Sequence, residues 1–355
     1  MVQPGIEEVI DRAEWNRVLS ALPLHDFHHT HDYHRLSCRP AQEAVLLSYV
    51  EEGLTVALPL VRERIPGTFL YDYTSVYGYG GPVCSQAPDA EQAGRFAEAV
   101  ATYMVEHRAV AVFSRLHPYI ADQERLLTGL GEVCGAGNVV NIDITLPPEE
   151  VRAAYGKSVK NQLNRLRRNC SIRRVETDAD LVLFAEIYVE TMDRLAASDS
   201  YLFDLGYFRA FRSSTDFETV ILLAIDDESG EATAGAMFVK TGEIVQYHLS
   251  GTRTAWIDQR SSKLLIDAMR IEAAEQGYRY FNLGGGLGAR ADTLFDYKAS
   301  FSKDVRPFST WRYIVSPAQY DELVVLALRD AAATGLCIDP DFFPRYRAPA
   351  SASDR

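Results

Sequence analysis

The sequence has few cysteines, and they lie far apart. Five is an odd number, and no two cysteines form a Cys-x-x-Cys pair. This spacing excludes a zinc ribbon and a disulfide framework, so we expect ordinary thiols. The five are Cys38, Cys84, Cys134, Cys170 and Cys337.

Long apolar runs are also missing. No run approaches the ~20 residues that a membrane-spanning helix needs, so we expect no stable membrane insertion. The first residues, Met-Val-Gln-Pro-Gly-Ile-Glu-Glu, lack the basic and apolar segments of a signal peptide. A cytoplasmic protein is therefore the expectation.

Positive charge is in short supply. Lys and Arg number 36 against 49 Asp and Glu, which gives a net charge of −13. This balance argues against a general nucleic-acid binder and against DNA as a partner. Residues 157–174 nevertheless hold seven basic side chains and no acidic one. They form either a solvated helix face or a local phosphate-binding patch. The seven are Lys157, Lys160, Arg165, Arg167, Arg168, Arg173 and Arg174.

The length and composition fit a globular chain of two domains. It has 355 residues, of which 47% are hydrophobic and 24% charged. Pro147-Pro148 marks a boundary, so we expect a first domain over residues 1–147 and a second over 148–316. A C-terminal helix within residues 317–355 is expected to pack back on the first domain. The last ~10 residues, rich in Ala, Ser and Pro, are expected to be disordered.

Both domains show helices and strands in a similar order, which indicates a mixed α/β (α+β) fold. In the first domain we expect helices over 7–19 and 92–107, and strands over 44–50, 55–62, 109–116 and 139–146. In the second we expect helices over 151–168, 181–195 and 263–276, and the C-terminal helix is expected over 321–332. Strands are expected over 172–176, 219–225, 232–240, 244–250, 278–283 and 311–315.

One stretch combines a strand, a glycine loop and a lysine. Strand 278–283 is followed by four glycines in five residues, which permit positive φ and close approach of another group. Asp292 and Thr293 then offer a helix N-cap. Leu294, Lys298 and Phe301 share one face of that helix. Lys298 is either a lysine that reaches solvent from an apolar stripe or a cation placed over the loop.

Two segments of the first domain are rich in aromatic rings. Tyr71, Tyr73, Tyr77 and Tyr79 precede Gly80-Gly81-Pro82. They form either a strand with one aromatic face or a wall of a substrate site. Five of the eight histidines lie between His25 and His34. Their spacings match no standard metal motif, so no metal site is expected, and we interpret the segment as an aromatic and imidazole lid.

The motif Leu-Gly-Gly-Gly followed by Leu-Phe-x-Tyr-Lys-x-x-Phe resembles the Fem family of aminoacyl-tRNA-dependent ligases. The segments Tyr-Gly-Tyr-Gly-Gly-Pro and Arg-x-His-Pro resemble the same family. The resemblance spans most of the chain. It implies two tandem acetyltransferase-like (GNAT) domains with a cleft between them. It also implies transfer of an amino acid from aminoacyl-tRNA to an amine, on a peptidoglycan precursor or a peptidyl antibiotic, without a cofactor.

The resemblance also implies roles for individual residues. Lys298 and Tyr297 resemble the pair beside the transferred acyl group. Thr191 and Arg194 resemble residues that hold phosphates of a nucleotide-linked or peptidyl acceptor, and Tyr247 resembles a residue that lines the same site. Further substrate-binding candidates are Tyr33, Tyr77, Tyr79, Arg115, His117, Gly284, Gly285 and Gly286. The candidates for tRNA binding are Lys157, Lys160, Arg165, Arg167 and Arg168.

Two departures from the family pattern concern the chemistry and the tRNA. Cys84-Ser85 stand where the first domain often has an aspartate, so a dedicated carboxylate base is absent from that position. The long charged helical arm is absent too, so any tRNA contact must come from the globular surface. An aminoacyl ester is already activated, and Lys298 suffices to stabilise the oxyanion.

Two other functions stay open. An acyl-CoA N-acyltransferase would cradle pyrophosphate on a glycine-containing turn before a helix. Residues 257–263 hold Gln259 and Arg260 but lack both glycines. A non-catalytic binding module of the same fold is the other alternative.

Overall fold

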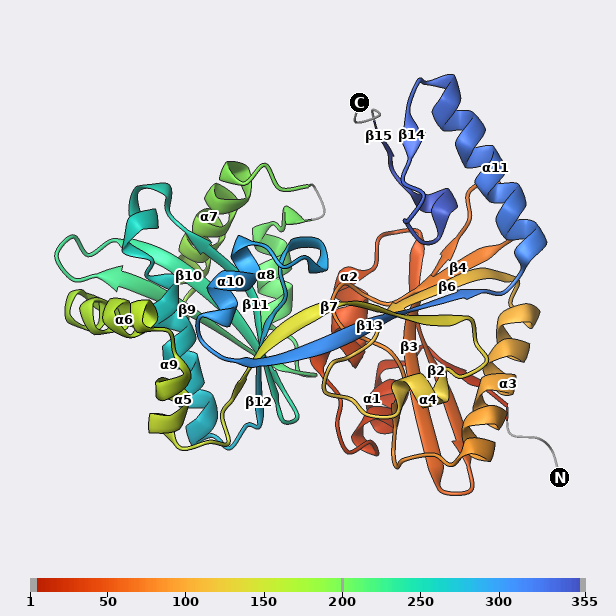
Figure 1. The fold of residues 1–355 in the computed structure, drawn as a ribbon, viewed down its shortest axis with the longest axis horizontal. Coiled ribbons are helices and arrows are strands. Elements are labelled where there is room, and N and C mark those ends of the chain that lie inside the picture. Colours follow the sequence, from red (N-terminus) through yellow and green to blue (C-terminus); the bar gives the residue numbers. More distant parts are fainter. Residues whose placement is uncertain (1–4, 199–200, 352–355) are drawn as a thin grey trace. The chain divides into compact units, whose positions relative to one another are not determined.

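The computed structural model describes residues 5–198 and 201–351 (Figure 1). The chain forms two compact units. Unit 1 contains the residues up to Ala136 together with those from Phe308 onwards, and unit 2 is Gly137–Pro307. The chain thus leaves unit 1, forms unit 2 and returns. Both crossings lie inside strands, β7 (Glu132–Asp143) and β13 (Asp304–Ile314), whereas the sequence places the boundary at Pro147-Pro148.

A mixed sheet forms the centre of unit 1, with the strand order β1-β2-β3-β4-β6-β13. The predicted hairpin is confirmed: β2 and β3 pair from Gln42↔Glu63 to Glu51↔Leu54. The chain reverses at Glu52-Gly53, where both residues have positive φ. Strands β4 and β6 run parallel, and the other neighbours are antiparallel. The bounds are β1 (Glu7–Val9), β2 (Gln42–Glu51), β3 (Leu54–Arg64), β4 (Tyr71–Thr74), β5 (Val83–Cys84) and β6 (Ala109–Arg115).

Helices cover both faces of this sheet, which explains why β2 is apolar on both sides. Val45 and Leu47 pack in one core cluster with α3 (Ala90–Glu106), and Leu46 packs in another with Trp15 of α1 (Arg12–Ser20). The predicted helix over 7–19 is wrong in its first turn. Residues 7–9 form β1 beside β2, and α1 starts only after Asp11, whose side chain accepts from the Glu14 N–H. The other short helices are η1 (Phe27–His29), α2 (His31–Ser37) and α4 (Gln123–Leu126).

The C-terminal part of the chain belongs to unit 1. The carboxylate of Asp72 on β4 accepts hydrogen bonds from the Tyr346 hydroxyl and, at 2.7 Å, from Arg347 Nε. The prediction of disorder over the last ~10 residues is therefore wrong for residues 346–351, and 352–355 lie outside the described residues. The elements are α11 (Pro317–Ala333), β14 (Cys337–Ile338), η5 (Arg345–Arg347) and β15 (Ala350–Ser351).

The strands of unit 2 lie in a mixed sheet in the order β7-β12-β11-β10-β9-β8. Strands β11 and β12 run parallel, and the remaining neighbours are antiparallel. A core that includes Phe238, Phe281 and Leu283 lies between this sheet and its helices. The bounds are β8 (Cys170–Arg174), β9 (Glu218–Asp226), β10 (Ala232–Thr241), β11 (Ile244–Thr252) and β12 (Tyr280–Gly284).

The helices of unit 2 differ from the prediction in two places. The basic helix expected over 151–168 is interrupted because Tyr155 and Gly156 are extended. It forms α5 (Pro148–Ala154) and α6 (Lys157–Asn169). Helix α8 (Leu205–Arg212) was not predicted. The others are α7 (Asp178–Arg194), η3 (Thr254–Gln259), α9 (Ser262–Glu275), η4 (Leu287–Ala289) and α10 (Thr293–Ala299). Among the described residues, no helix has the length and apolar character needed to cross a membrane.

The two units repeat one plan. In unit 1, helix α3 connects the parallel strands β4 and β6, and in unit 2, helix α9 connects the parallel strands β11 and β12. Each parallel pair has an antiparallel neighbour: β13 lies beside β6, and β7 lies beside β12. The repeated order of elements inferred from the sequence is thus confirmed as a repeated sheet topology.

Candidate functional site

Strand β12 of unit 2 ends at the glycine loop. Gly284 adopts φ +76°, a conformation that favours glycine. A side chain on Gly285 would meet the Asn138 carbonyl oxygen at 2.6 Å. The glycines are therefore required by backbone geometry, and they let neighbouring groups approach the strand end closely.

Asp292 connects this loop to the helix that carries the lysine. One carboxylate oxygen accepts from the Leu287 N–H at 2.9 Å, and the other accepts from the Phe295 N–H at 2.9 Å. These backbone hydrogen bonds hold the pKa of Asp292 below its usual value. The N-cap predicted at Asp292 is thus confirmed, and it fixes the start of α10 relative to the loop.

Lys298 of α10 points back to the glycine loop. Its side chain is buried, and Nζ donates to the carbonyl oxygen of Gly285 at 2.7 Å. Burial lowers the pKa of Lys298 to about 8, although the Asp292 carboxylate acts in the opposite direction. The lysine therefore does not reach out to solvent; it is a desolvated cation at a strand end.

Two tyrosine candidates, Tyr297 and Tyr247, belong to the same unit as this lysine. The Tyr297 hydroxyl is 3.0 Å from the Ser262 hydroxyl, and the Tyr247 hydroxyl donates to Ser250 at 2.6 Å. Burial raises the pKa of Tyr247 to about 12 and that of Tyr297 well above its usual range. Both phenols therefore stay protonated and serve as hydrogen-bonding groups.

Thr191 and Arg194 of α7 contact the end of β11. The single proton of the Thr191 hydroxyl is within hydrogen-bond reach of two carbonyls, Ile187 at 2.9 Å and Thr252 at 3.1 Å, and the hydroxyl oxygen accepts from the Thr252 N–H. This saturation does not favour the phosphate contact that the sequence suggested for Thr191. Arg194 Nη1 donates to the Thr252 carbonyl and to Thr254, both at 2.9 Å, while the residue itself is exposed.

The start of α9 is where a CoA-binding turn would lie. Arg260 takes the left-handed conformation, with φ 56°. The N–H groups of Lys263 and Leu264 donate to the carbonyls of Arg260 and Ser261. Because the backbone already uses these N–H groups, this turn is poorly suited to cradle a pyrophosphate.

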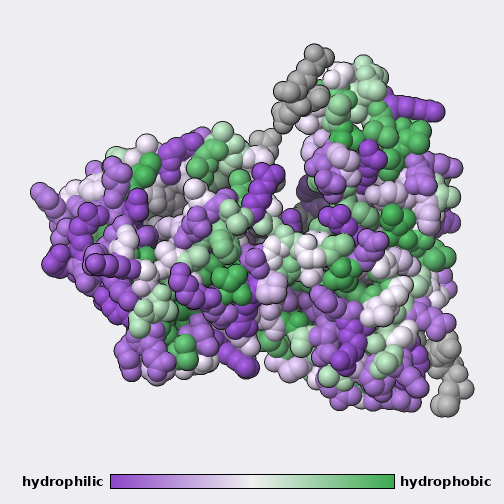
Figure 2. Space-filling view, viewed as in Figure 1, coloured by the Kyte–Doolittle hydropathy of each residue, from purple (hydrophilic) through white to green (hydrophobic). Residues whose placement is uncertain are grey.

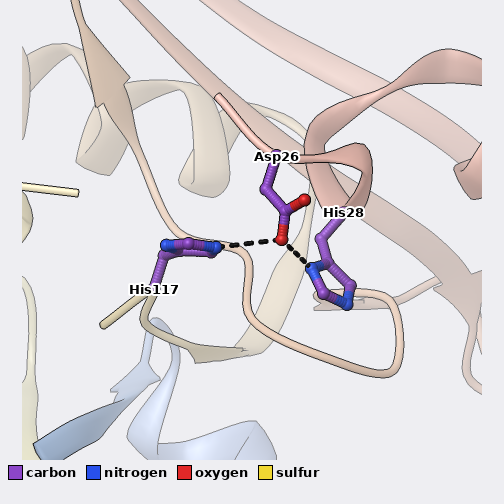
Figure 3. A group of neighbouring side chains, drawn as sticks. All are labelled: Asp26, His28 and His117. Atoms are coloured by element: carbon purple, nitrogen blue, oxygen red, sulfur yellow. Dashed lines mark hydrogen bonds and ion pairs between the residues drawn. The ribbon is translucent and has the colours of Figure 1, made fainter. Parts of the chain in front are cut away.

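In unit 1, two histidines share one buried carboxylate (Figure 3). Asp26 Oδ2 is 2.7 Å from His28 Nδ1 and 3.0 Å from His117 Nε2. Burial alone would raise the pKa of Asp26, but the two imidazoles outweigh it and hold that pKa well below its usual range. The histidine-rich segment is therefore packed core and not the lid that we expected, since His29 and His34 are also fully buried.

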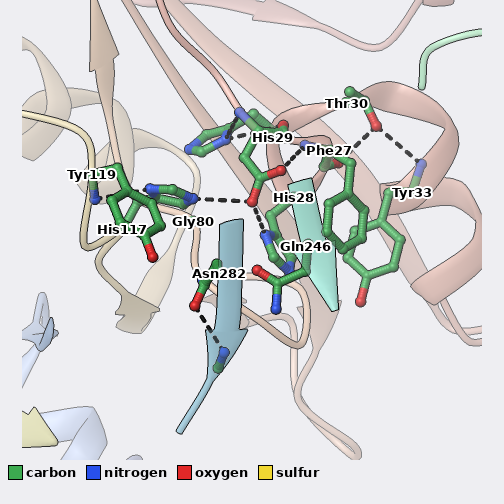
Figure 4. Close-up of polar contacts among 12 residues, drawn as sticks. Phe27, His28, His29, Thr30, Tyr33, Gly80, His117, Tyr119, Gln246 and Asn282 are labelled. Atoms are coloured by element: carbon green, nitrogen blue, oxygen red, sulfur yellow. Dashed lines mark hydrogen bonds and ion pairs between the residues drawn. The ribbon is translucent and has the colours of Figure 1, made fainter. Parts of the chain in front are cut away.

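Asp26, His28 and His117 could also ligate a metal by position, since their ligand atoms lie within 4.8 Å of one another. The Tyr119 N–H donates to His117 Nδ1 at 3.3 Å (Figure 4). The proton of the neutral ring is therefore on Nε2, where it donates to Asp26. This tautomer favours a hydrogen-bonded cluster over a ligand set.

The other first-domain candidates gather around this cluster. The Tyr33 hydroxyl donates to the Tyr77 carbonyl at 2.7 Å, and the Arg115 guanidinium lies over the Tyr77 ring at 5.7 Å. Tyr79 contacts the rings of His28 and His117 edge-on. The structure thus brings together Tyr33, Tyr77, Tyr79, Arg115 and His117, which the sequence placed in one group.

The basic residues predicted to bind tRNA follow α6, and Figure 2 shows hydrophilic surface over this helix. Val159, Leu163 and Leu166 form its buried face, and Lys157, Arg165 and Arg168 are exposed. Three candidates are engaged within unit 2. Lys160 donates to the Ala153 carbonyl at 2.8 Å, the exposed Arg165 donates to the Gln259 carbonyl at 3.3 Å, and Arg167 forms an ion pair with the buried Asp267.

Comparisons with known proteins agree with this architecture. Residues 153–299 match the family described as "Acetyltransferase (GNAT) domain". The crystal structure of FemX is similar over 89% of this chain and 99% of its own, with 13% identity and a TM-score of 0.69. The structure of L-PGS from Bacillus licheniformis covers 90% of this chain and 96% of its own, with 12% identity and a TM-score of 0.55.

A third structure is the C-terminal domain of a putative lysylphosphatidylglycerol synthetase from Agrobacterium fabrum. It covers 91% of this chain and 97% of its own, with 15% identity and a TM-score of 0.53. No curated protein sequence matches the chain. The chain has a Fem-like tandem GNAT fold. The domain match includes Lys298.

Proposed function

We propose that this protein is an acyltransferase that moves an amino acid from aminoacyl-tRNA to an amine on a small peptidyl or nucleotide-linked acceptor. The product is an amide bond. The observation that supports this most is Lys298, a buried ammonium beside a glycine loop. No carboxylate among the described residues lies within ion-pair distance of its Nζ. A desolvated, unpaired cation is available for an oxyanion.

The reaction needs little else. The neutral acceptor amine attacks the ester carbonyl, a C–N bond forms, and the C–O bond to the ribose breaks. The amine proton passes to the departing ribose oxygen, directly or through water. Lys298 donates to the oxygen that becomes negative in the tetrahedral intermediate, and one such donor contributes about 2.7–4 kcal/mol. Tyr297 and Tyr247 orient substrate through their hydroxyls.

The tRNA binds the exposed basic face of α6. Lys157, Arg165 and Arg168 project from the side opposite the buried stripe. Each phosphate contact releases counterions, so even a few such residues make binding depend on salt. Arg167 is reassigned to the structure of unit 2, because its guanidinium pairs with Asp267.

The acceptor is held through charge and aromatic area. Arg194 uses one nitrogen for the end of β11 and offers its remaining N–H groups to a phosphate or carboxylate. Tyr247, in the same unit as Arg194, offers aromatic area and a hydroxyl. A peptidoglycan precursor and a peptidyl natural product both fit this description.

One assay tests the proposal. The protein is incubated with a full set of charged tRNAs and a panel of amine acceptors, and products are identified by mass. We expect a mass gain of one aminoacyl residue on an acceptor. A parallel reaction contains acetyl-CoA or longer acyl-CoA thioesters without tRNA. Acyl transfer from CoA alone would replace the proposal with the CoA-dependent reaction, and ligand binding without turnover would favour a binding module.

A further inference from the structure

Three carboxamides lie side by side across neighbouring strands of unit 2. Asn282 of β12 pairs in register with Gln246 of β11 and with Asn141 of β7. Paired residues on adjacent strands project from the same face of a sheet, with the strands about 4.8 Å apart. All three side chains are at least nine-tenths buried. We call Asn141, Asn282 and Gln246 the carboxamide row.

The orientation of each carboxamide is fixed by its hydrogen-bond partner, because that partner group can only accept or can only donate. Asn141 Nδ2 donates to the Asp304 carboxylate at 2.6 Å. Asn282 Oδ1 accepts from the Gly284 N–H at 2.8 Å (Figure 4). Gln246 Nε2 donates to the Tyr247 carbonyl at 3.2 Å. The assignment of O and N therefore follows from chemistry at each position.

The second polar atom of each carboxamide has no partner. Asn141 Oδ1, Asn282 Nδ2 and Gln246 Oε1 are buried and make no hydrogen bond within the described part of the chain. In the strand order β7, β12, β11, the unpaired atoms are an acceptor on Asn141, a donor on Asn282 and an acceptor on Gln246. Leaving three buried polar atoms unpaired costs stability, and such groups occur where a ligand or water completes them.

This row adjoins Lys298. A side chain on Gly284 would place its first carbon 3.3 Å from Lys298 Nζ and 3.8 Å from Gln246 Nε2. Gly284 therefore lies close to both the ammonium and the Gln246 end of the row. A small group held beside Lys298 would meet the row from this end.

We infer that the carboxamide row is the subsite for the α-amino group of the transferred aminoacyl unit. The inference rests on the proposed function and deepens it, because it names what distinguishes the donor from a simple acyl group. The ammonium donates to Gln246 Oε1, the acceptor at the end of the row next to Gly284, and the ester carbonyl oxygen accepts from Asn282 Nδ2 and Lys298 Nζ. A plain acyl group would leave the Gln246 acceptor unpaired.

The chemistry of the donor tests this on the unaltered protein. The same tRNA is charged with the amino acid found in the transfer assay, with its N-acetyl derivative or with the corresponding α-hydroxy acid. The hydroxy acid has nearly the same size and lacks the ammonium. Hydrogen bonds to a charged group are worth roughly 10- to 100-fold in rate or affinity. We expect kcat/KM to fall by about that factor with the hydroxyacyl donor.

Substitutions at Gln246 test whether this residue causes the preference for the aminoacyl donor. Gln246→Met removes the acceptor at similar volume and should reduce the preference for the amino over the hydroxy donor to within about threefold. Gln246→Glu keeps an acceptor oxygen and should retain the preference. Thr241→Val is the control: Thr241 of β10 is also buried with an unpartnered hydroxyl and pairs with Ile244, which precedes Gln246 by two residues on β11 and is not part of the row. Thermal unfolding of each variant shows that it is folded.

Each outcome decides the matter. Loss of donor preference in Gln246→Met alone supports the inference. Equal use of amino and hydroxy donors by the unaltered protein overturns it, while the aminoacyltransferase function stands. A preference that persists in Gln246→Met means that water completes the row, which also overturns the inference. No transfer from any aminoacyl-tRNA, with transfer from acyl-CoA, overturns both proposals.

Discussion

The ammonium of Lys298 lies 2.7 Å from the carbonyl oxygen of Gly285. One helix and one loop, separated by a tight turn, therefore hold each other in place. Asp292 supports the arrangement by accepting from N–H groups on both sides of it. Because the contact partner is a neutral carbonyl, the charge of Lys298 is not cancelled and is available to a substrate.

Lys298→Met should reduce turnover by roughly 100- to 1000-fold while the protein stays folded and binds both substrates. Methionine keeps most of the buried stem and removes the charge, so packing and electrostatics are separated. Lys303→Met, at an exposed lysine five residues further on, is the control and should behave as the unaltered protein. Turnover of Lys298→Met within about threefold of the unaltered protein would end the assignment.

Turnover should fall as pH rises through about 8. The oxyanion donor is the ammonium form of Lys298, and burial lowers its pKa to about 8, so the active form is lost above that pH. Lys298→Arg keeps the charge at every accessible pH and should remove this falling limb even if its rate is lower. A profile that keeps the limb in the arginine variant would assign the titration to another group.

Gly284→Ala should lower activity well below that of Gly288→Ala, although the two variants should lose similar stability. Both Gly284 and Gly288 have positive φ, 76° and 59°, so alanine at either costs about 1 kcal/mol of unfolding free energy. Only at Gly284 does the new methyl group approach Lys298 Nζ, at 3.3 Å, since nothing lies within 4 Å at Gly288. Gly288→Ala is thus a matched control for strain. Equal activity of the two variants would show that the space above Gly284 is not used.

Arg168→Glu should weaken tRNA binding, whereas Arg167→Glu should lower the stability of the fold. Arg168 is exposed, so its reversal should weaken tRNA binding and reduce the salt slope by about 1 or more without loss of stability. Arg167 pairs with the buried Asp267, so a glutamate there should cost about 1–3 kcal/mol in denaturant unfolding. Filter binding across salt concentrations and urea melts measure the two effects. Unchanged affinity in Arg168→Glu would make the basic face only a solvated surface.

Unit 1 should lose stability between pH 6.5 and 4. Burial lowers the pKa of His34 from its ordinary 6.5 to about 4, so in that window the unfolded chain binds more protons. The unfolding free energy therefore falls as pH falls, by about 3 kcal/mol for this ring. His34→Leu should flatten that part of the stability curve. An unchanged slope in urea melts at several pH values would contradict the burial of a neutral ring.

Local features of the fold could be predicted because their causes are local. The β2–β3 hairpin follows from two short apolar runs separated by a glycine turn, and the start of α10 follows from Asp292 as N-cap. The strand at 7–9 could not be predicted because only pairing with β2 makes it one. The signal that Asp11 begins α1 was present, with Glu14 three residues later.

The candidate site divides in the same way. Lys298 was found because motif and helix spacing lie within one short stretch. Asp26 was missed, since His117 is 91 residues away from it, and no spacing rule connects them. The carboxamide row was missed for the same reason: Asn141, Asn282 and Gln246 become neighbours only through strand register.

The placement of β7 and β13 has a consequence for any attempt to divide the protein. β13 completes the sheet of unit 1 although the chain reaches it only after unit 2, and part of β7 completes the sheet of unit 2 although it precedes most of that unit. A cut near residue 147 would leave the N-terminal piece without Trp311, whose fully buried indole donates to the Leu130 carbonyl. It would also leave the backbone edge of β6 unpaired and prone to aggregation. Unit 2 can be excised as one continuous segment, 137–307, whereas unit 1 can be produced alone only by joining residue 136 to residue 308 through a linker.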